Sequence, residues 1–367
     1  MSGAPASETI RLHRGDPAPH WVAATDANPR FVFSSLAGRY VLLGFLGSAG
    51  QPGVKEALAE LPTGATALNA EHACAMLISL DPADREQGRI PQNPPFWRAV
   101  WDFDAAVSRA YGVAAPGENG LRFAPCWMLL DPQLRVLETA PLHAVPTLLA
   151  RLAALPPPGL HAGAAVPAPV LVLPRIFEPE LCRALIAEYD RQGGEISGFM
   201  REVDGKTVAV HDRGHKVRRD VLLEDGPLKT ATQQRISRRL VPEIARSFQF
   251  QVTRLERYLV ACYAAEEGGH FAAHRDNTTK GTAHRRFAVS INLNAEDFSG
   301  GDLRFPEFGP ATYRPPTGGA VVFSCSLLHQ ALPVTAGRRY AFLPFLYDEA
   351  AAKIRAENLK FIAQPTG

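Results

Sequence analysis

Cysteine is scarce in this chain of 367 residues, and its five cysteines are scattered, odd in number and without a CxxC pair. Such a set argues against a disulfide framework and against a paired-cysteine redox centre. We therefore expect buried thiols in the reducing environment of the cytoplasm. The cysteines are Cys74, Cys126, Cys182, Cys262 and Cys325.

The chain also lacks an excess of charge of one sign. Its formal net charge is +2 and it has no dense basic run, so no nucleic-acid partner is expected. No apolar stretch approaches the roughly 20 residues of a membrane span. The first residues lack the charged-then-apolar pattern of a secretory signal. These absences predict a cytoplasmic protein with no membrane partner.

A run rich in proline, alanine and glycine lies between residues 155 and 169. Such a run is semi-rigid and cannot form a packed core, so it predicts a linker between two domains. The length of the chain also exceeds that of one typical domain. We expect a first domain at 10–154, the linker at 155–169, a second domain at 170–348, and a C-terminal helix and tail at 349–367.

Strand and helix patterns alternate in the first domain. Residues 40–46 and 75–80 are continuous apolar runs, as in a sheet that is covered on both faces. Residues 54–61 and 96–111 are expected to form helices, and a hairpin is expected from about 126 to 138. The pattern predicts an α/β sandwich.

The second domain contains a candidate metal site. Two imidazoles and one carboxylate, from His274, Asp276 and His329, would leave three coordination positions open, as non-haem Fe(II) oxygenases require. His274 and Asp276 are two residues apart and would share one face of a strand. A chance match in an exposed loop is the alternative, but alternating apolar patterns at 258–263 and 287–294 predict ordered strands on both sides.

From about residue 170 to 348 the chain resembles the catalytic domain of 2-oxoglutarate- and Fe(II)-dependent dioxygenases of the prolyl 4-hydroxylase type. The resemblance implies a double-stranded β-helix, which is a jelly roll, with flanking helices. It is carried by Ala261-Cys-Tyr263, His274-Arg-Asp276, Leu293-Asn294, Gly300-Gly301, Phe305-Pro306, His329, Pro333-Val334 and Gly337-x-Arg339-Tyr340.

This resemblance implies Fe(II) at His274, Asp276 and His329, with 2-oxoglutarate and O₂ as co-substrates and ascorbate as the reductant. The C5 carboxylate of 2-oxoglutarate needs a cation, and the guanidinium of Arg339 offers parallel donors to it. Arg338 competes for this role, but adjacent strand residues face opposite ways. The resemblance favours Arg339, next to an aromatic residue.

Tyr263 resembles the family tyrosine whose hydroxyl bonds the same carboxylate, and a core aromatic is the alternative. Residues 200–216 belong to a basic, glycine-punctuated stretch that predicts a hairpin. They are a candidate lid over the substrate, with a solvated loop as the alternative. Arg213, His215 and Arg286 are the candidate substrate contacts.

Residues 10–154 resemble the thioredoxin-like fold of the peroxiredoxin (AhpC/TSA) family. The resemblance is carried by the segments 15–19, 36–38, 111–113 and 129–131. Val54 stands where that family has its peroxidatic cysteine, so we expect no catalytic cysteine here. This domain is expected to be a scaffold for partner or substrate binding, or for a homodimer.

Three functions stay open. The first is hydroxylation of a prolyl residue in a peptide or protein, with coupled decarboxylation of 2-oxoglutarate to succinate and CO₂. Asp276 favours hydroxylation, because related halogenases lack this carboxylate. The second is hydroxylation of a free amino acid or another small molecule. The third is a non-enzymatic adaptor with a degenerate oxygenase site.

Overall fold

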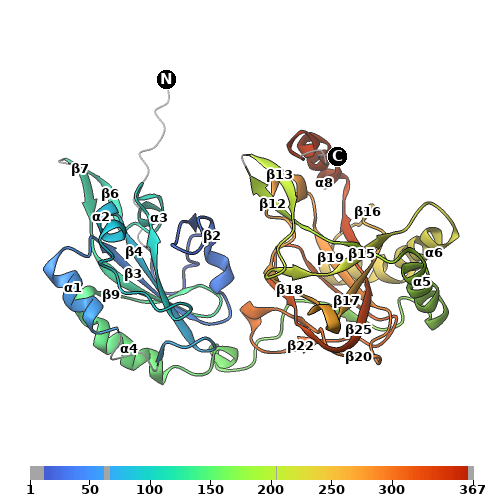
Figure 1. Cartoon of the computed structure of the whole chain (residues 1–367), viewed down its shortest axis with the longest axis horizontal. Helices are drawn as coiled ribbons and strands as arrows, with labels where there is room; N and C mark the ends of the chain where they lie inside the picture. Colours follow the sequence, from blue (N-terminus) through green and yellow to red (C-terminus); the bar gives the residue numbers. More distant parts are fainter. Residues whose placement is uncertain (1–11, 62–66, 119, 204, 363–367) are drawn as a thin grey trace. The chain divides into compact units, whose positions relative to one another are not determined.

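The computed structural model describes residues 12–61, 67–118, 120–203 and 205–362. The expectations for residues 1–11 and for the tail at 363–367 lie outside the described residues. The chain forms two compact units, residues 1–167 with 306–309 and residues 168–305 with 310–367 (Figure 1). The expected two-domain architecture is confirmed.

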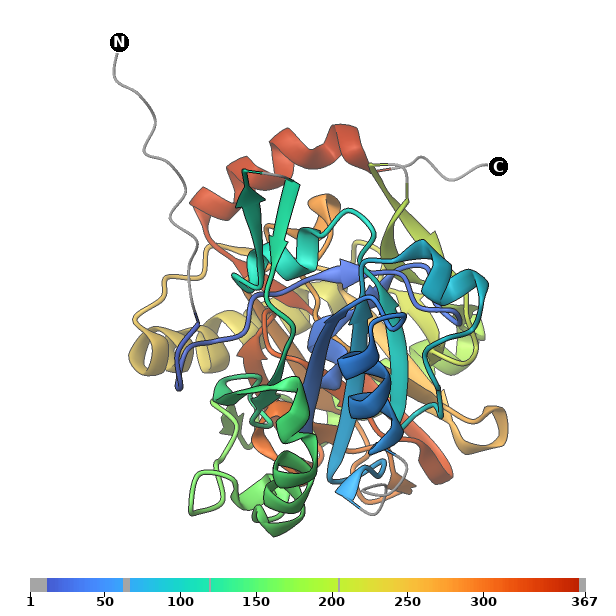
Figure 2. The ribbon, with the colours of Figure 1, turned by 90° about the vertical axis from the view of Figure 1, so that its left-hand side faces the viewer.

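Unit 1 is built on a five-stranded sheet of order β5-β4-β3-β8-β9. Neighbours β3, β4 and β5 are parallel, whereas β8 and β9 run antiparallel to their neighbours. Its sheet strands are β3 (Tyr40–Gly47), β4 (Ala73–Ser79), β5 (Trp97–Trp101), β8 (Cys126–Leu130) and β9 (Val136–Pro141). Its helices are α1 (Pro52–Ala59), α2 (Pro82–Glu86), α3 (Ala106–Ala110) and α4 (Val145–Ala154). Two small ribbons, β1 (Val22–Ala23) with β2 (Phe31–Val32) and β6 (Ala114–Gly117) with β7 (Gly120–Phe123), complete it (Figure 2).

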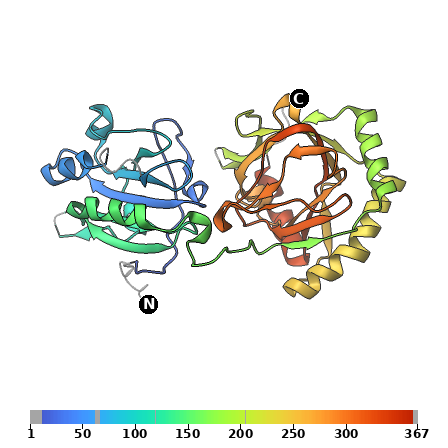
Figure 3. The same ribbon diagram turned by 90° about the horizontal axis from the view of Figure 1, so that it is seen from below.

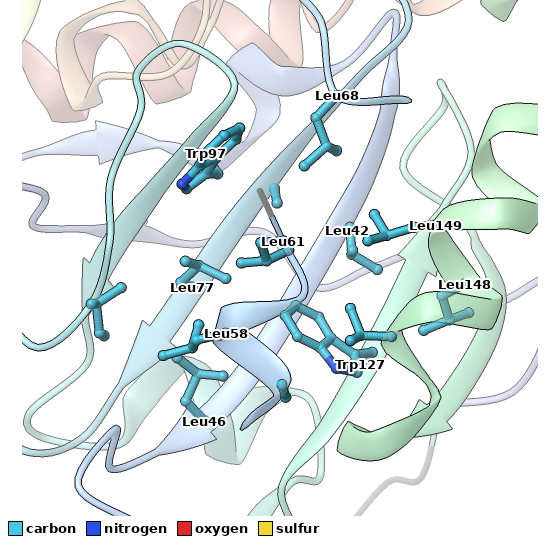
Figure 4. Packing of buried hydrophobic residues seen from close by; sticks show 14 of the residues in the cluster. Leu42, Leu46, Leu58, Leu61, Leu68, Leu77, Trp97, Trp127, Leu148 and Leu149 are labelled. Atoms are coloured by element: carbon cyan, nitrogen blue, oxygen red, sulfur yellow. The ribbon is translucent and has the colours of Figure 1, made fainter. Parts of the chain in front are cut away.

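The core of unit 1 lies between this sheet and two helices. Every residue of β4 is buried, as the continuous apolar run predicted. Leu42 and Trp127 of the sheet pack with Leu58 of α1 and Leu148 of α4 in one buried cluster (Figure 4). Helix α1 begins at Pro52, which suits the first turn because proline needs no hydrogen-bond acceptor there.

The helix predicted for residues 96–111 is wrong. Residues 97–101 form β5, which pairs in parallel with β4, and only Ala106–Ala110 are helical. Trp97 and Trp101 are both buried in the core cluster. Pairing with a distant strand therefore overrides the local helical pattern.

Unit 2 contains two antiparallel sheets and a separate hairpin. The larger sheet has the order β10-β23-β19-β25-β17-β15-β11, with β16, β20 and β26 paired at its side, and the smaller has the order β14-β18-β24-β21-β22. The hairpin joins β12 (Phe199–Val203) and β13 (Lys206–Val210). The other strands are β10 (Leu171–Leu173), β11 (Glu195–Ile196), β14 (Lys216–Val217), β15 (Arg219–Leu222), β16 (Arg254–Glu256), β17 (Leu259–Ala264), β18 (His270–His274), β19 (Phe287–Asn292), β20 (Phe298–Gly300), β21 (Leu303–Arg304), β22 (Thr312–Tyr313), β23 (Ala320–Ser324), β24 (His329–Ala331), β25 (Val334–Phe342) and β26 (Phe345–Tyr347).

The helices of unit 2 lie on one side of its strands (Figure 3). They are α5 (Pro179–Gln192), α6 (Pro227–Arg235), the π-helical turn η5 (Ile236–Leu240) and α7 (Val241–Phe248), while α8 (Glu349–Asn358) follows the last strand. Helix α5 has Pro179 in its first turn and is capped at its C-terminal end by Gly193, whose φ of 83° is the left-handed conformation that glycine tolerates.

Alternation along β17 decides which side chains face the helices and which face the space between the sheets. Val260 belongs to the buried cluster that includes the α5 and α7 side chains. Leu259, Ala261 and Tyr263 belong to a different cluster, with residues of β20, β24 and β25. The residues that point between the sheets form the site described next. No helix among the described residues is both long and apolar enough to cross a membrane.

Candidate metal centre

Strands β18 and β24 bring the two histidines of the motif together. His274 and His329 are directly paired across these strands, and their ring centroids are 4.3 Å apart. Strand β18 ends at His274, so Asp276 lies in a turn just beyond the strand rather than within it. Its carboxylate still reaches both rings, with Oδ1 3.6 Å from His274 Nε2 and Oδ2 3.3 Å from His329 Nε2. The ligand atoms of all three residues lie within 4.8 Å of one another.

The hydrogen bonds of the two imidazole rings leave the Nε2 atom of each ring available to bind a metal. Nδ1 of His274 lies 2.8 Å from the carbonyl oxygen of Ala272, and Nδ1 of His329 lies 3.0 Å from that of Leu327. A carbonyl can only accept, so each Nδ1 carries the proton and each Nε2 presents a lone pair toward Asp276. Such backbone bonds fix the tautomer of metal-binding histidines.

The charges of the triad also suit a divalent cation. Burial, followed by the influence of nearby His274, lowers the pKa of His329 to about 4, so the ring is neutral at pH 7. Burial alone would raise the pKa of Asp276, but the two imidazoles and Arg285 hold it below its ordinary value. Two imidazoles and one carboxylate form a donor set that fits Fe(II).

Aromatic rings cover the two imidazoles. The ring of Phe271 stacks on His274 with centroids 3.5 Å apart, and the ring of Phe323 lies 4.6 Å from that of His329. These contacts restrict rotation of the imidazoles and keep water from their faces.

A largely buried carboxylate behind the triad was not predicted from the sequence. Glu256 accepts from Arg285 Nε at 2.9 Å and lies 3.0 Å from His284 Nε2. Arg285 Nη1 in turn donates to the carbonyl oxygen of Asp276 at 3.4 Å. No motif in the sequence pointed to Glu256, because its partners lie on segments that only the fold brings together.

Arg339 points into the space between the sheets and Arg338 points out. Arg339 is 3% exposed, pairs with Tyr263 across β25 and β17, and has its guanidinium carbon 5.2 Å from the Tyr263 ring centroid. Its Nη2 donates to Ser290 Oγ at 2.8 Å. Within the described residues Arg339 forms no ion pair. The side chain of Arg338 is 56% exposed and pairs with Glu266.

Of the three candidate substrate contacts, His215 lies beside the triad. Its ring centroid is 6.4 Å from that of His274 and 4.3 Å from that of Phe199, at the base of the β12–β13 hairpin. Arg213 is exposed and donates to the carbonyl of Glu267, and Arg286 donates to the carbonyl of Ala283. The fold therefore does not aim these two arginines at the triad.

Two further buried basic residues near the site were not predicted from the sequence as site residues. Lys216 and Arg218 are each 6% exposed, and Arg218 Nη1 lies 3.3 Å from the hydroxyl of Tyr263. The sequence signal for them was their alternation with Asp220, which places three charges on one face of an extended segment.

In unit 1, Val54 stands at the position where the peroxiredoxin family has its cysteine, and its side chain is buried in α1. All five cysteines of the chain are free, and only Cys126 is half-exposed. Burial raises the pKa of the Cys74 and Cys126 thiols to about 11, so neither is a thiolate at neutral pH.

Comparison with known proteins bears on unit 2. Residues 258–347 match the family model of the 2OG-Fe(II) oxygenase superfamily, which confirms the resemblance for the segment that holds the triad, Tyr263 and Arg339. PKHD-type hydroxylases of two Synechococcus strains are 27% identical over 125 residues, which cover 31% of this chain. The chain spans only 55% of the length of these relatives.

Two solved structures are similar to separate parts of the chain. A Trichoplax adhaerens prolyl hydroxylase in complex with a hypoxia inducible factor peptide is 19% identical, covers 51% of this chain and 86% of its own, and has a TM-score of 0.40. The peroxidoxin BcpB of Mycobacterium tuberculosis is 20% identical, covers 40% of this chain and 99% of its own, and has a TM-score of 0.34.

Proposed function

We propose that this protein is a 2-oxoglutarate- and Fe(II)-dependent dioxygenase whose jelly-roll domain hydroxylates a prolyl residue of a peptide or protein. Hydroxylation is coupled to decarboxylation of 2-oxoglutarate to succinate and CO₂. One observation carries the proposal: two imidazole Nε2 atoms and a carboxylate converge, and the buried Arg339 lies in the same interior without a carboxylate partner among the described residues.

Each residue has a separate task in this proposal. His274, Asp276 and His329 hold Fe(II), which when bound activates O₂ for the hydroxylation of a C–H bond. Arg339 binds the C5 carboxylate of 2-oxoglutarate through its guanidinium, and the Tyr263 hydroxyl donates to the same group. Phe271 and Phe323 exclude water from the imidazole faces, which strengthens electrostatic interactions inside the site.

The substrate assignment is supported by the motif resemblance to the prolyl 4-hydroxylase type. Strands β12 and β13 form a hairpin whose base contacts His215 beside the triad, and this hairpin is the proposed lid over the substrate. We place the protein in the cytoplasm with ascorbate as reductant. Unit 1, which has Val54 at the nucleophile position, is the proposed scaffold that recruits the substrate or forms a homodimer.

The test uses the full chain with Fe(II), 2-oxoglutarate, ascorbate and O₂. Proline-containing peptides and matched peptides with alanine in place of proline are screened by mass spectrometry for the gain of one oxygen, together with succinate. Oxygen gained only by the proline peptides supports the proposal. Oxygen gained only by small molecules moves the assignment to the second function. Absence of both metal binding and 2-oxoglutarate turnover indicates an adaptor and refutes an oxygenase.

A further inference from the structure

Three charged residues line one face of the extended segment that joins the two sheets of unit 2. Lys216 lies in β14, Arg218 follows it, and Asp220 lies in β15 directly opposite Ala261. Because Ala261 belongs to the cluster that lies between the sheets, residues at alternate positions face the same interior. The row is therefore on the side of the triad and not on the side of the helices.

Arg218 has more donor capacity than the interior satisfies. Its Nη2 donates to Asp220 Oδ2 at 2.6 Å, whereas its buried Nε has no hydrogen-bond partner among the described residues. Arg257 Nη2 is also 3.5 Å from the same Oδ2 atom of Asp220. One carboxylate thus serves two guanidinium groups, and the interior keeps an excess of positive charge.

Lys216 adds a third basic side chain, and it has no carboxylate of its own. Its Nζ donates to Ser197 Oγ at 2.7 Å and to the carbonyl oxygen of Gly198 at 2.6 Å, and it forms no ion pair within the described part of the chain. Nζ also lies 4.9 Å from the ring centroid of Phe271, the ring that stacks on His274. Phe271 therefore contacts both the Lys216 amine and His274, one of the proposed metal ligands.

A buried ammonium without a counter-charge costs free energy, and proteins normally avoid it. Burial, followed by the charge of Arg218, lowers the pKa of Lys216 to about 6, so without an anion beside it the amine is mostly neutral at pH 7, and a bound carboxylate would favour its protonated form. A hydrophobic residue would be more stable at this position. An anion that enters the interior would supply the missing counter-charge for Lys216 and an acceptor for Arg218.

Resting on the proposed function, we propose that Lys216 and Arg218 bind a carboxylate of the primary substrate, so that the enzyme prefers a free amino acid or a peptide whose prolyl residue carries the C-terminal carboxylate. This site adjoins that of 2-oxoglutarate at Tyr263 but uses a different arginine. Arg339 approaches Tyr263 from β25, whereas Arg218 approaches it from the β14–β15 segment, with guanidinium carbons 5.2 and 5.7 Å from the ring centroid.

The experiment measures binding rather than turnover. Calorimetric titrations without O₂ use the full chain loaded with Fe(II) and 2-oxoglutarate. L-proline is compared with L-prolinamide, and the dipeptide Gly-Pro with its C-terminal amide. Each acid should bind about 10- to 100-fold more tightly than its amide, because a hydrogen bond to a charged group is lost in the amide. Which acid binds more tightly distinguishes a free amino acid from a peptide terminus.

Lys216→Met should remove most of this preference while leaving the affinity for 2-oxoglutarate unchanged. The matched control is Arg219→Met on the next residue, whose side chain is 38% exposed and pairs with Glu267; it should keep the preference. Lys216→Met should also unfold at no lower temperature than the parent, whereas a purely structural lysine would lose stability on substitution.

Equal affinity of acid and amide, or no binding of either, overturns the inference. Should Lys216→Met fail to fold, the acid–amide comparison on the unaltered chain still decides, and Lys216→Arg should retain the preference. The outcomes also separate this inference from the proposed function. Oxygen added equally to acids and amides overturns only the inference. Selective acid binding with no oxygen added supports the carboxylate site and overturns the hydroxylase.

Discussion

Replacing Arg339 with alanine should raise the concentration of 2-oxoglutarate that the enzyme requires far more than replacing Arg338. The two arginines are adjacent in sequence, but Arg339 is 3% exposed and lies beside Tyr263, whereas the Arg338 side chain is 56% exposed. The same substitution at the two positions therefore compares a buried cation with a solvated one.

The magnitude follows from this difference in burial. Removing the charged partner of a buried carboxylate costs about 2–5 kcal/mol, and each 1.4 kcal/mol is tenfold, so Arg339→Ala should weaken 2-oxoglutarate binding by about 30-fold to several thousand-fold. The exposed pair of Arg338 with Glu266 is screened by water, so Arg338→Ala should change the affinity for 2-oxoglutarate by less than about fivefold. Arg339→Lys should fall between them, because it keeps the charge but loses the parallel donors.

The assay is succinate formation as a function of 2-oxoglutarate concentration, with direct calorimetric binding as a second readout. A comparison of unfolding midpoints checks that the Arg339 variants remain folded, because Ser290 loses its hydrogen-bond partner. A larger effect at Arg338 than at Arg339 would refute the reasoning and would mean that the register of β25 differs by one residue from that in the structure.

The remaining predictions concern the metal, a buried acid and unit 1. His274→Ala, Asp276→Ala and His329→Ala should each abolish stoichiometric Fe(II) binding and 2-oxoglutarate turnover, and full turnover in any of them would show that the ligand assignment is wrong. Burial opposes ionisation of Glu256, but His284 and Arg285 lower its pKa from 4.5 to about 2. Its stabilising contribution is therefore complete above pH 4.5 and is lost as the pH falls toward 2. Glu256→Gln should lower the free energy of urea unfolding at pH 7 by about 3 kcal/mol and should weaken the dependence of that free energy on pH between 4.5 and 2. An unchanged pH dependence in this range would contradict the assignment. Full-length protein should consume no peroxide through a thiol, and Cys74→Ser and Cys126→Ser should leave oxygenase turnover intact; peroxide consumption that depends on either cysteine would overturn the scaffold assignment.

Local sequence was sufficient wherever a pattern and its punctuation agreed. Proline and glycine, the residues that commonly start and stop helices, stand at the two ends of α5, and the apolar run at 75–80 became part of β4, every residue of which is buried. The histidines and the aspartate could also be found, because metal ligation demands particular side chains at particular spacings. These features depend on short-range backbone preferences or on chemistry that few residue types can supply.

Other features depended on pairing between distant segments. Residues 97–101 became a strand because β4 accepts them as a parallel neighbour, although a helical pattern ran through them. Arg285, which no sequence pattern singled out, approaches Asp276, because Glu256 from β16 accepts a hydrogen bond from its guanidinium. Side-chain direction in a sheet changes with every residue, so a register fixed by a remote partner decides what points inward.

The sequence by itself determined the donor set of the candidate metal centre, the α/β character of unit 1 and the presence of valine at position 54, where the peroxiredoxin family that this unit resembles has its cysteine. Only the tertiary structure decided that Lys216 and Arg218 are buried, that Arg218 lies beside Tyr263, and that Asp220 is the counter-charge of both Arg218 and Arg257. The reason is that a charge has no energetic meaning until its surroundings are known. A charged lysine side chain costs little free energy in water and much in a protein interior, and burial is a property of the whole fold.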